Sequence, residues 1–274
     1  MNRSRTNSLS PGQREVAPGR FRRPARWGGL LLLAVLLLGI AGLYWRDRLI
    51  ALWYPVTQMI APKRSVQDVL EALGPAAWDR LQPSLEAAGF AEAPPERLRF
   101  VAFKEEKELE VWGAGPDGLW RPIRRYPILA ASGGPGPKLA EGDRQVPEGL
   151  YPITLLNPNS AYHLSLRIGY PSPEDLAIAR HEGRQNLGGD IMLHGKELSI
   201  GCLAMGDPAI EELFVLTARV GVVHSDILIA PFDLRARAAG DPRPWMEARY
   251  DDMRRLLQAL PPVRWPRDDE EEGE

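Results

Sequence analysis

The chain has 274 residues, enough for one ordinary domain with additional segments at its ends. Its formal net charge of −2 gives no overall basic field, so we do not expect a nucleic acid partner. The single cysteine, Cys202, excludes an internal disulfide framework.

The first 45 residues divide into a basic segment and an apolar segment. Residues 1–26 are rich in arginine and polar residues, which predicts a disordered tail. Residues 27–45 contain an uncharged run flanked by tryptophans, and this length of helix, roughly 28 Å, can cross a bilayer core. We therefore predict a transmembrane anchor. A cleaved signal peptide stays open, because Gly39 and Ala41 have the spacing of a cleavage site.

The arginines before the apolar run predict a cytoplasmic N-terminus. We expect a single-pass protein of the inner (cytoplasmic) membrane, with lipid around residues 27–45 and the folded part in the periplasm or cell-wall space.

Two helices are predicted after this anchor. Ser65 begins the first, and Gly74 ends it. The second covers residues 76–88, where Pro83 predicts a kink or a break. This section is either a spacer that holds the next domain away from the membrane or a lid packed on that domain, and we favour the spacer.

From Arg97 the hydrophobic pattern has a period of two, which is typical of strands. A helix follows, with Asp207 as its N-cap, Pro208 in its first turn and Gly221 at its end. The fold class predicted is mainly β with peripheral helices (α+β). The strands expected are 98–103, 108–112, 120–123, 162–168 and 227–229, and residues 246–260 form a C-terminal amphipathic helix.

Residues 190–205 hold Cys202 and His194 within one short stretch. The apolar residues 191–193 predict a strand that ends at His194, and Gly195 permits a sharp turn before the chain returns to Cys202. An imidazole beside a thiol is the usual way to form a nucleophilic thiolate. The alternatives are a buried structural cysteine and a zinc ligand, although this spacing matches no common zinc motif.

The same stretch resembles the active-site signature of the L,D-transpeptidase catalytic domain, the YkuD-like family of peptidoglycan enzymes. His194-Gly195 and Ser199-x-Gly201-Cys202 match that signature. Ile200 and Ala204 depart from it, because the family commonly has His and then Arg or Asn there. The flanking segments 149–153, 157–164 and 186–190 extend the resemblance, which is closest to the murein branch with a Ser-Ile-Gly-Cys motif.

The resemblance implies a two-sheet, sandwich-like domain and a cysteine acyltransferase that acts on peptidoglycan stem peptides. His194 is then the base and Cys202 the nucleophile, which forms a thioester, and backbone amides around Ser199, Ile200 and Gly201 form the oxyanion hole. The alternatives are a hydrolytic member that cuts murein–murein or murein–lipoprotein linkages, and a non-catalytic wall-binding module. An apolar Ile200 could seal the site against water and so favour transfer, but apolar residues at 200 and 204 could equally remove contacts to an acceptor peptide, and we favour hydrolysis slightly. A wall-linked lipoprotein is a further candidate partner.

His163, Arg167, Gly195 and Lys196 are candidate substrate-binding residues, and the charged ones are equally consistent with ordinary surface positions. We expect no metal and no cofactor. The predicted organisation is a cytoplasmic tail (1–26), the anchor (27–45), a juxtamembrane and helical spacer (46–95), the catalytic domain (96–235), and a C-terminal helix with an acidic tail (236–274).

Overall fold

The structure is a computed structural model that describes residues 62–197, 201–241, 243–263 and 265. The predicted anchor at 27–45 and the acidic tail at 268–272 lie outside these residues. Within the described part of the chain, no helix has the length and apolar character needed to cross a membrane.

A nine-stranded mixed sheet forms the centre of the domain, in the order β3-β2-β1-β9-β5-β6-β7-β8-β4. Its strands are β1 (Arg97–Phe103), β2 (Glu108–Ala114), β3 (Trp120–Pro127), β4 (Ala130–Ala131), β5 (Gly149–Ser160), β6 (His163–Ile168), β7 (Met192–His194), β8 (Leu203–Ala204) and β9 (Ser225–Ala230). The strands predicted at 98–103, 108–112, 120–123, 162–168 and 227–229 all correspond to observed strands.

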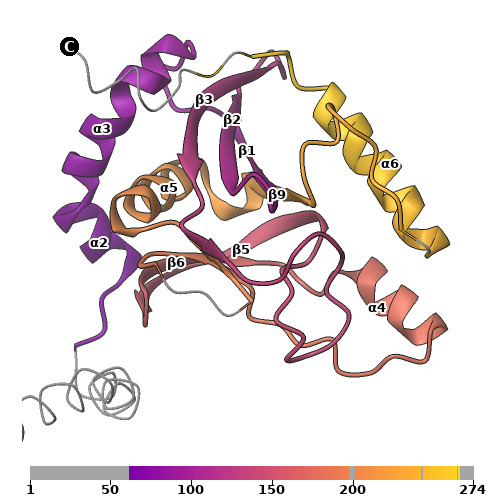
Figure 1. Ribbon diagram of the computed structural model, residues 1–274. Helices are drawn as coiled ribbons and strands as arrows, with labels where there is room; N and C mark the ends of the chain where they lie inside the picture. Colours follow the sequence, from indigo (N-terminus) through magenta and orange to yellow (C-terminus); the bar gives the residue numbers. More distant parts are fainter. Residues whose placement is uncertain (1–61, 198–200, 242, 264, 266–274) are drawn as a thin grey trace, which may run out of the picture. The chain divides into compact units, whose positions relative to one another are not determined.

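Strand β5 joins the two halves of this sheet. Its first residues, 149–152, pair with β9, and the remainder pairs with β6. The halves lie on opposite sides of helix α5 (Asp207–Val220), as Figure 1 shows. The α+β class is confirmed, but one continuous sheet replaces the two separate sheets that were expected.

Helix α5 is the centre of the hydrophobic core. Its buried side chains include Ile210, Leu213 and Phe214, which pack against β1, β6 and β7. Gly221 ends the helix as predicted, but the N-cap is Gly206 and not Asp207. The Asp207 carboxylate accepts hydrogen bonds from Lys196 instead, so a tertiary contact replaces the expected local cap.

Helices α2 (Val66–Ala72) and α3 (Gly74–Ala87) belong to the same domain. Ser65 caps α2 as predicted, and α3 is not broken at Pro83. The buried α3 residues Leu81 and Leu85 share the core with α5 and the sheet. The helical section is therefore packed on the domain, and the spacer prediction is wrong for residues 66–87.

Helix α6 (Pro244–Gln258) covers the outer face of β1, β2 and β9, where Met246, Tyr250 and Met253 pack against Trp112. Strand β1 is thus buried on both faces, which explains its nearly unbroken apolar sequence. The predicted C-terminal helix is confirmed, although it packs on the sheet and was expected to lie in a segment outside the catalytic domain. Helix α4 (Pro173–His181) and the short 3₁₀ helix η1 (Val222–His224) were not predicted.

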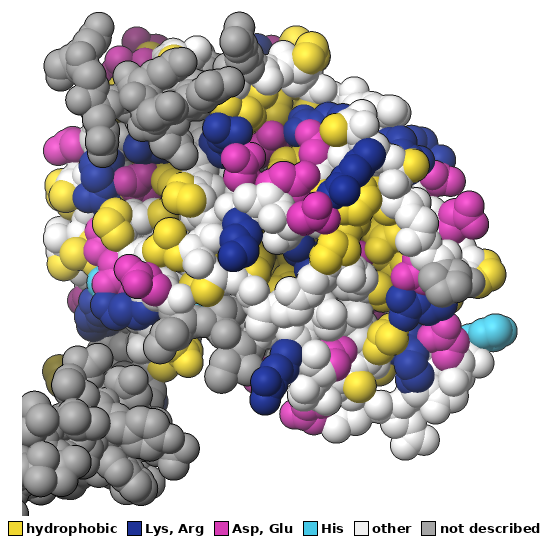
Figure 2. Space-filling view, viewed as in Figure 1, with side chains coloured by type: hydrophobic (Ala, Val, Ile, Leu, Met, Phe, Trp, Pro, Cys, Tyr) yellow, Lys and Arg dark blue, Asp and Glu magenta, His cyan; other side chains and the backbone are white. Residues whose placement is uncertain are grey.

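Acidic and basic side chains are intermixed on the face of the domain shown in Figure 2. The ion pairs of the domain include Arg99–Asp226 and Arg235–Glu110. This distribution agrees with the formal charge of −2.

Candidate active site

His194 ends β7, and Cys202 directly precedes β8. These two short strands run in parallel, with Leu193 opposite Leu203 and His194 opposite Ala204. The return segment expected before Cys202 includes residues 198–200, which lie outside the described residues; the strand that pairs with β7 is β8, and it is parallel to β7 and not a hairpin partner.

The register places His194 and Cys202 on one face of the sheet. Leu193 and Leu203 are fully buried in the core with α5, and side chains alternate between faces along a strand. His194 consequently lies on the opposite face, and the same alternation, continued by one residue before β8, puts Cys202 on that face as well. Strand spacing and rise put their Cα atoms roughly 8 Å apart on a diagonal, a separation that an imidazole can bridge.

The imidazole of His194 is fixed by a backbone bond. Its Nδ1 lies 2.7 Å from the carbonyl oxygen of Gly195. A carbonyl can only accept, so Nδ1 carries the proton and Nε2 keeps a lone pair. Burial lowers the pKa of His194, and the hydrogen bond to Gly195 opposes part of this effect. Because the pKa lies below its ordinary value, the ring is neutral near pH 7 and able to act as a base. The ring of Tyr162 covers it, with centroids 4.6 Å apart.

The Cys202 thiol lies in a partly buried position. Its Sγ is 3.7 Å from the carbonyl oxygen of Asp190. Burial raises the pKa of Cys202, and the negative charge of Asp190 acts in the same direction, while the Met192 amide and the Lys138 ammonium oppose them. The thiol is therefore mainly protonated at rest, and forming a thiolate requires a base.

The predicted oxyanion segment is described only at Gly201, because Ser199 and Ile200 lie outside the described residues. The Gly201 amide donates to the hydroxyl of Ser132, which lies in the loop after β4. This amide is thus occupied in the structure. Ser132 is a neighbour that sequence analysis missed, since it is far away in the chain.

The candidate substrate-binding residues divide into two groups. Arg167 is cross-strand from Met192 and forms an exposed ion pair with Asp190, at 2.8 Å. It therefore lies at the rim of the His194–Cys202 face. His163, at the start of β6, is instead engaged by Glu211 of α5, with Nε2 at 2.8 Å from the carboxylate oxygen.

Gly195 and Lys196 have structural partners at the start of α5. A Cβ on Gly195 would lie 2.6 Å from Oδ1 of Asp207 and 2.7 Å from the Tyr162 carbonyl oxygen, so no side chain fits there. The Lys196 backbone amide donates to Oδ1 of Asp207 at 3.0 Å, and its ammonium pairs with the same carboxylate. Lys196 is thus a carboxylate-bound cation in this structure.

Two further residues near His194 were missed by sequence analysis. Ser165 is the direct cross-strand neighbour of His194 and is almost fully buried. Its place on the same face as Arg167 follows from strand alternation, which was the available signal. Tyr162 precedes that strand, and its packing on the imidazole has no local signal.

A cavity of about 620 Å³ adjoins Tyr162 at the end of β7. Leu129, Lys196, Asp207 and Pro208 line it together with backbone around Gly206. Within the described residues, no group of three or more His, Cys, Asp or Glu side chains could hold a metal ion.

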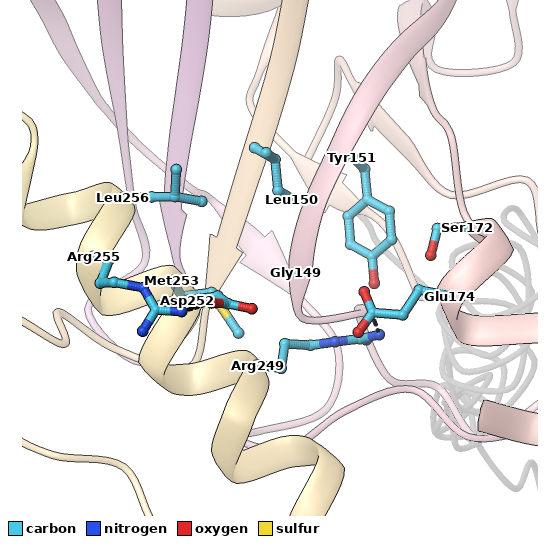
Figure 3. Close-up of a pocket in the computed structure, with 10 residues that line it drawn as sticks. All are labelled: Gly149, Leu150, Tyr151, Ser172, Glu174, Arg249, Asp252, Met253, Arg255 and Leu256. Atoms are coloured by element: carbon cyan, nitrogen blue, oxygen red, sulfur yellow. Dashed lines mark hydrogen bonds and ion pairs between the residues drawn. The ribbon is translucent and has the colours of Figure 1, made fainter. Parts of the chain in front are cut away.

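A second cleft, of about 490 Å³, lies between the start of β5, helix α4 and helix α6. Figure 3 shows the Arg249 guanidinium directed at the Glu174 carboxylate, 3.3 Å away. Arg249 also pairs with Asp175 at 2.7 Å, and Arg255 pairs with Asp252. Acids of the domain thus neutralise the cations of this cleft, and it contains neither His194 nor Cys202.

Comparison with known proteins identifies homologues over part of the chain. No family model matches it. Over 114 residues it is 37% identical to the "Putative L,D-transpeptidase YafK" of Escherichia coli K12, and equally to that of Escherichia coli O157:H7. The aligned region is 41% of this chain and 44% of each relative, so the chain spans less than half of their length.

Solved structures with a similar arrangement include two proteins of bacterial origin. The helical cell shape determining protein Pgp2 from Campylobacter jejuni is 24% identical, with a TM-score of 0.40 and coverage of 48% of this chain and 47% of that one. Mycobacterium tuberculosis L,D-transpeptidase 1 is 15% identical, with a TM-score of 0.28 and coverage of 49% and 62%.

Proposed function

We propose that this chain is a cysteine L,D-transpeptidase that acts on peptidoglycan stem peptides through a thioester. The observation that carries this proposal is the pairing of β7, which ends at His194, with β8, which Cys202 directly precedes; the Gly195 carbonyl also holds the imidazole as the Nδ1–H tautomer. The homology to the "Putative L,D-transpeptidase YafK" of Escherichia coli supports the peptidoglycan substrate.

The first step is proton transfer from the Cys202 thiol to Nε2 of His194. The raised pKa of the thiol and the lowered pKa of the imidazole mean that neither group ionises alone near neutral pH. Transfer is therefore coupled to attack of sulfur on the amide carbonyl carbon, which gives a tetrahedral intermediate. The imidazolium that forms is stabilised by the Gly195 carbonyl at Nδ1.

The second step breaks the carbon–nitrogen bond. The amine leaves with the proton from Nε2, and the acyl group stays on Cys202 as a thioester. In a murein donor, as the resemblance implies, the amine is the D-alanine at the end of a stem tetrapeptide. An amine of another stem, or water, then attacks the thioester and restores the thiol.

The oxyanion that forms in the first step requires hydrogen-bond donors. The Gly201 amide can serve only if the Ser132 hydroxyl first leaves it. Substrate binding must therefore displace Ser132 from Gly201. Arg167, at the rim, is the cation best placed to bind a stem-peptide carboxylate once Asp190 is displaced from it.

The basic tail and the apolar segment 27–45 support a membrane anchor, with the domain in the periplasm or cell-wall space. Protease added to spheroplasts of the host should digest residues 62–274 or the connection to them. Full protection until lysis would contradict this topology.

The activity is tested with purified residues 62–274, digested peptidoglycan and mass analysis of the products. Wild type should release D-alanine and form a mass adduct on Cys202. Cys202→Ser and His194→Gln should lose activity by about 10³-fold or more while they keep the wild-type thermal transition. His181→Gln is the matched control, because His181 ends α4 outside the site, and it should be unaffected. Full activity of Cys202→Ser in a folded state would exclude the proposed nucleophile.

The same reaction distinguishes transfer from hydrolysis. Ala204 lies opposite His194 and is fully buried, so it offers no polar group to an acceptor peptide. This favours water as the second nucleophile, because water needs no peptide recognition. In the presence of an amine acceptor, free tripeptide should then exceed cross-linked product. If cross-linked product dominates instead, the hydrolytic hypothesis is wrong and only the transferase hypothesis remains.

A further inference from the structure

The peptide group between Gly195 and Lys196 is hydrogen-bonded at both of its ends. Its carbonyl oxygen accepts from Nδ1 of His194 at 2.7 Å. Its N–H donates to Oδ1 of Asp207 at 3.0 Å. A single planar amide thus connects the imidazole to a carboxylate at the start of α5.

The direction of these bonds has an electrostatic consequence. A carboxylate that accepts a hydrogen bond from an amide N–H polarises that peptide group. The polarisation increases the negative charge on the carbonyl oxygen of the same amide. That oxygen becomes a stronger acceptor for the His194 Nδ1–H. The imidazolium form, which has the more acidic proton, gains more from this than the neutral ring.

The local backbone shows that this contact is maintained against a conformational cost. Lys196 has φ +60, a left-handed conformation that is unfavourable for a residue with a side chain. Gly195 has no room for a Cβ, because Oδ1 of Asp207 would lie 2.6 Å from it. The close approach of Asp207 therefore requires glycine at 195.

Asp207 is ionised at neutral pH. Burial alone would raise the pKa of Asp207, but hydrogen bonds from the Lys196 side chain and backbone outweigh it and place that pKa below the ordinary value of 3.8. Its position in the first turn of α5 also suits a negative charge, because the helix dipole is positive there.

We propose that Asp207 is a positioning residue for His194, acting through the Gly195–Lys196 peptide group: it orients the imidazole and stabilises its protonated form. This inference rests on the proposed function for its catalytic meaning. The coupling itself is a property of the folded protein and is measurable without any reaction.

Other titratable or charged groups lie on the elements packed around His194. On the strand side these are Arg167, His163 and the phenol of Tyr162. Asp190 pairs with Arg167, and Glu211 of α5 pairs with His163.

The remaining groups belong to the loop between β7 and β8. They are Glu197, the Cys202 thiol and the ammonium of Lys196, which is paired with Asp207 itself. Because Lys196 offsets part of the carboxylate charge, its removal should increase the effect of Asp207 on His194.

The test is an NMR titration of the His194 ring in the full chain carrying Cys202→Ser, so that the thiol does not titrate nearby. The chain has four histidines, and His194→Gln assigns the signal. Asp207→Asn keeps an oxygen acceptor for the Lys196 amide but removes the charge. It should lower the His194 pKa by about 0.3–1 unit, whereas Lys196→Met should raise it.

Glu174→Gln is the matched control, because Glu174 is a first-turn acid of another helix, α4. It should leave the His194 pKa unchanged. In the enzyme with Cys202, Asp207→Asn should shift the acid limb of the kcat/KM profile to lower pH by the same amount. An unchanged His194 pKa in folded Asp207→Asn, or an equal shift in Glu174→Gln, would overturn the proposal.

A second measurement needs no substitution at Asp207. The Lys196 amide proton of the Cys202→Ser chain should change its chemical shift as His194 titrates, because both groups bind the same peptide unit. An amide shift that ignores the His194 titration contradicts the coupling, whether or not Asp207→Asn folds. Loss of the proposed enzyme activity would leave both NMR results intact, so the two hypotheses fail separately.

Discussion

Gly195→Ala is the substitution that most directly tests the packing of the candidate site. The new Cβ would lie 2.6 Å from Oδ1 of Asp207 and 2.7 Å from the carbonyl oxygen of Tyr162, whereas ordinary contact begins at 3.4 Å. One obstacle is backbone, so a side-chain rotation cannot relieve the overlap. The backbone at 195 must move by several tenths of an ångström, and the Gly195 carbonyl moves with it.

Overpacking of this kind costs about 1–3 kcal/mol of unfolding free energy. For a domain of this size, that is a fall in Tm of about 2–4 °C for each kcal/mol. The loss of activity should be larger than the loss of stability suggests, about 10²-fold, because the shift misdirects the imidazole of His194. Thermal unfolding and the peptidoglycan assay measure the two effects separately.

Gly240→Ala is the matched control, because nothing lies within 4 Å of a Cβ at that exposed position. It should leave both the Tm and the activity unchanged. If Gly195→Ala keeps full activity and the wild-type Tm, then Asp207 and Tyr162 do not confine Gly195 as described.

Three other predictions concern the titration of the site and the buried ion pairs. In the proposed dyad, His194 is neutral and Cys202 keeps its proton, so activity should rise as the imidazolium of His194 loses a proton and fall as the Cys202 thiol ionises. Burial lowers the pKa of His194 from 6.5 and raises that of Cys202 from 9.0, so the acid limb should lie below pH 6.5 and the basic limb above pH 9.0. A pH profile of kcat/KM measures both limbs, and an acid limb above 6.5 would contradict the burial argument. Glu212→Ala should lower the unfolding free energy by about 3–5 kcal/mol, because buried Glu212 accepts hydrogen bonds from Arg80 of α3 and from Tyr126 of β3. Denaturant unfolding measures this, with Glu86→Ala, at an exposed position of α3, as the control. If the two variants are equally stable, Glu212 does not hold α3 on the domain. Lys104→Met should lower the unfolding free energy by about 3–5 kcal/mol, because it leaves buried Glu148 without its ammonium partner. Adding Glu148→Gln should recover part of that lost stability. A double variant that is no more stable than Lys104→Met alone would contradict the pairing.

Local patterns were sufficient to predict much of the fold. The apolar residues of β1, the spacing within α5 and the glycine at 221 each act through neighbours in sequence. Helix α4 was missed because only Asp175 and Ala179 are buried in it, so it lacks a continuous apolar stripe. Its capping box at Ser172 and Asp175 was the available signal.

The errors arose where a distant partner decides the conformation. Asp207 has the sequence context of an N-cap, but its carboxylate binds Lys196, so Gly206 takes the cap position. The helices at 66–87 look self-contained, yet Arg80 reaches Glu212 at 2.6 Å and joins them to α5. No local pattern contains either contact.

The candidate site shows the same division. His194, Gly195 and Cys202 could be chosen from their types and order, because a thiol, an imidazole and a glycine in one short segment are chemically informative. The Gly201–Ser132 contact and the ring of Tyr162 over His194 depend on the fold. They join segments that sequence order separates.

The alignment of His194 with Cys202 is itself fixed by the core. A slip of one residue between β7 and β8 would turn either Leu193 or Leu203 out of the core, and each is fully buried. Burial of one leucine stabilises the structure by about 1.5–3 kcal/mol, so the slipped register is populated at less than about 10%. The same slip would move the imidazole to the face opposite the thiol. Two leucines without chemical function therefore fix the alignment of the imidazole with the thiol, and they do so in the folded chain alone.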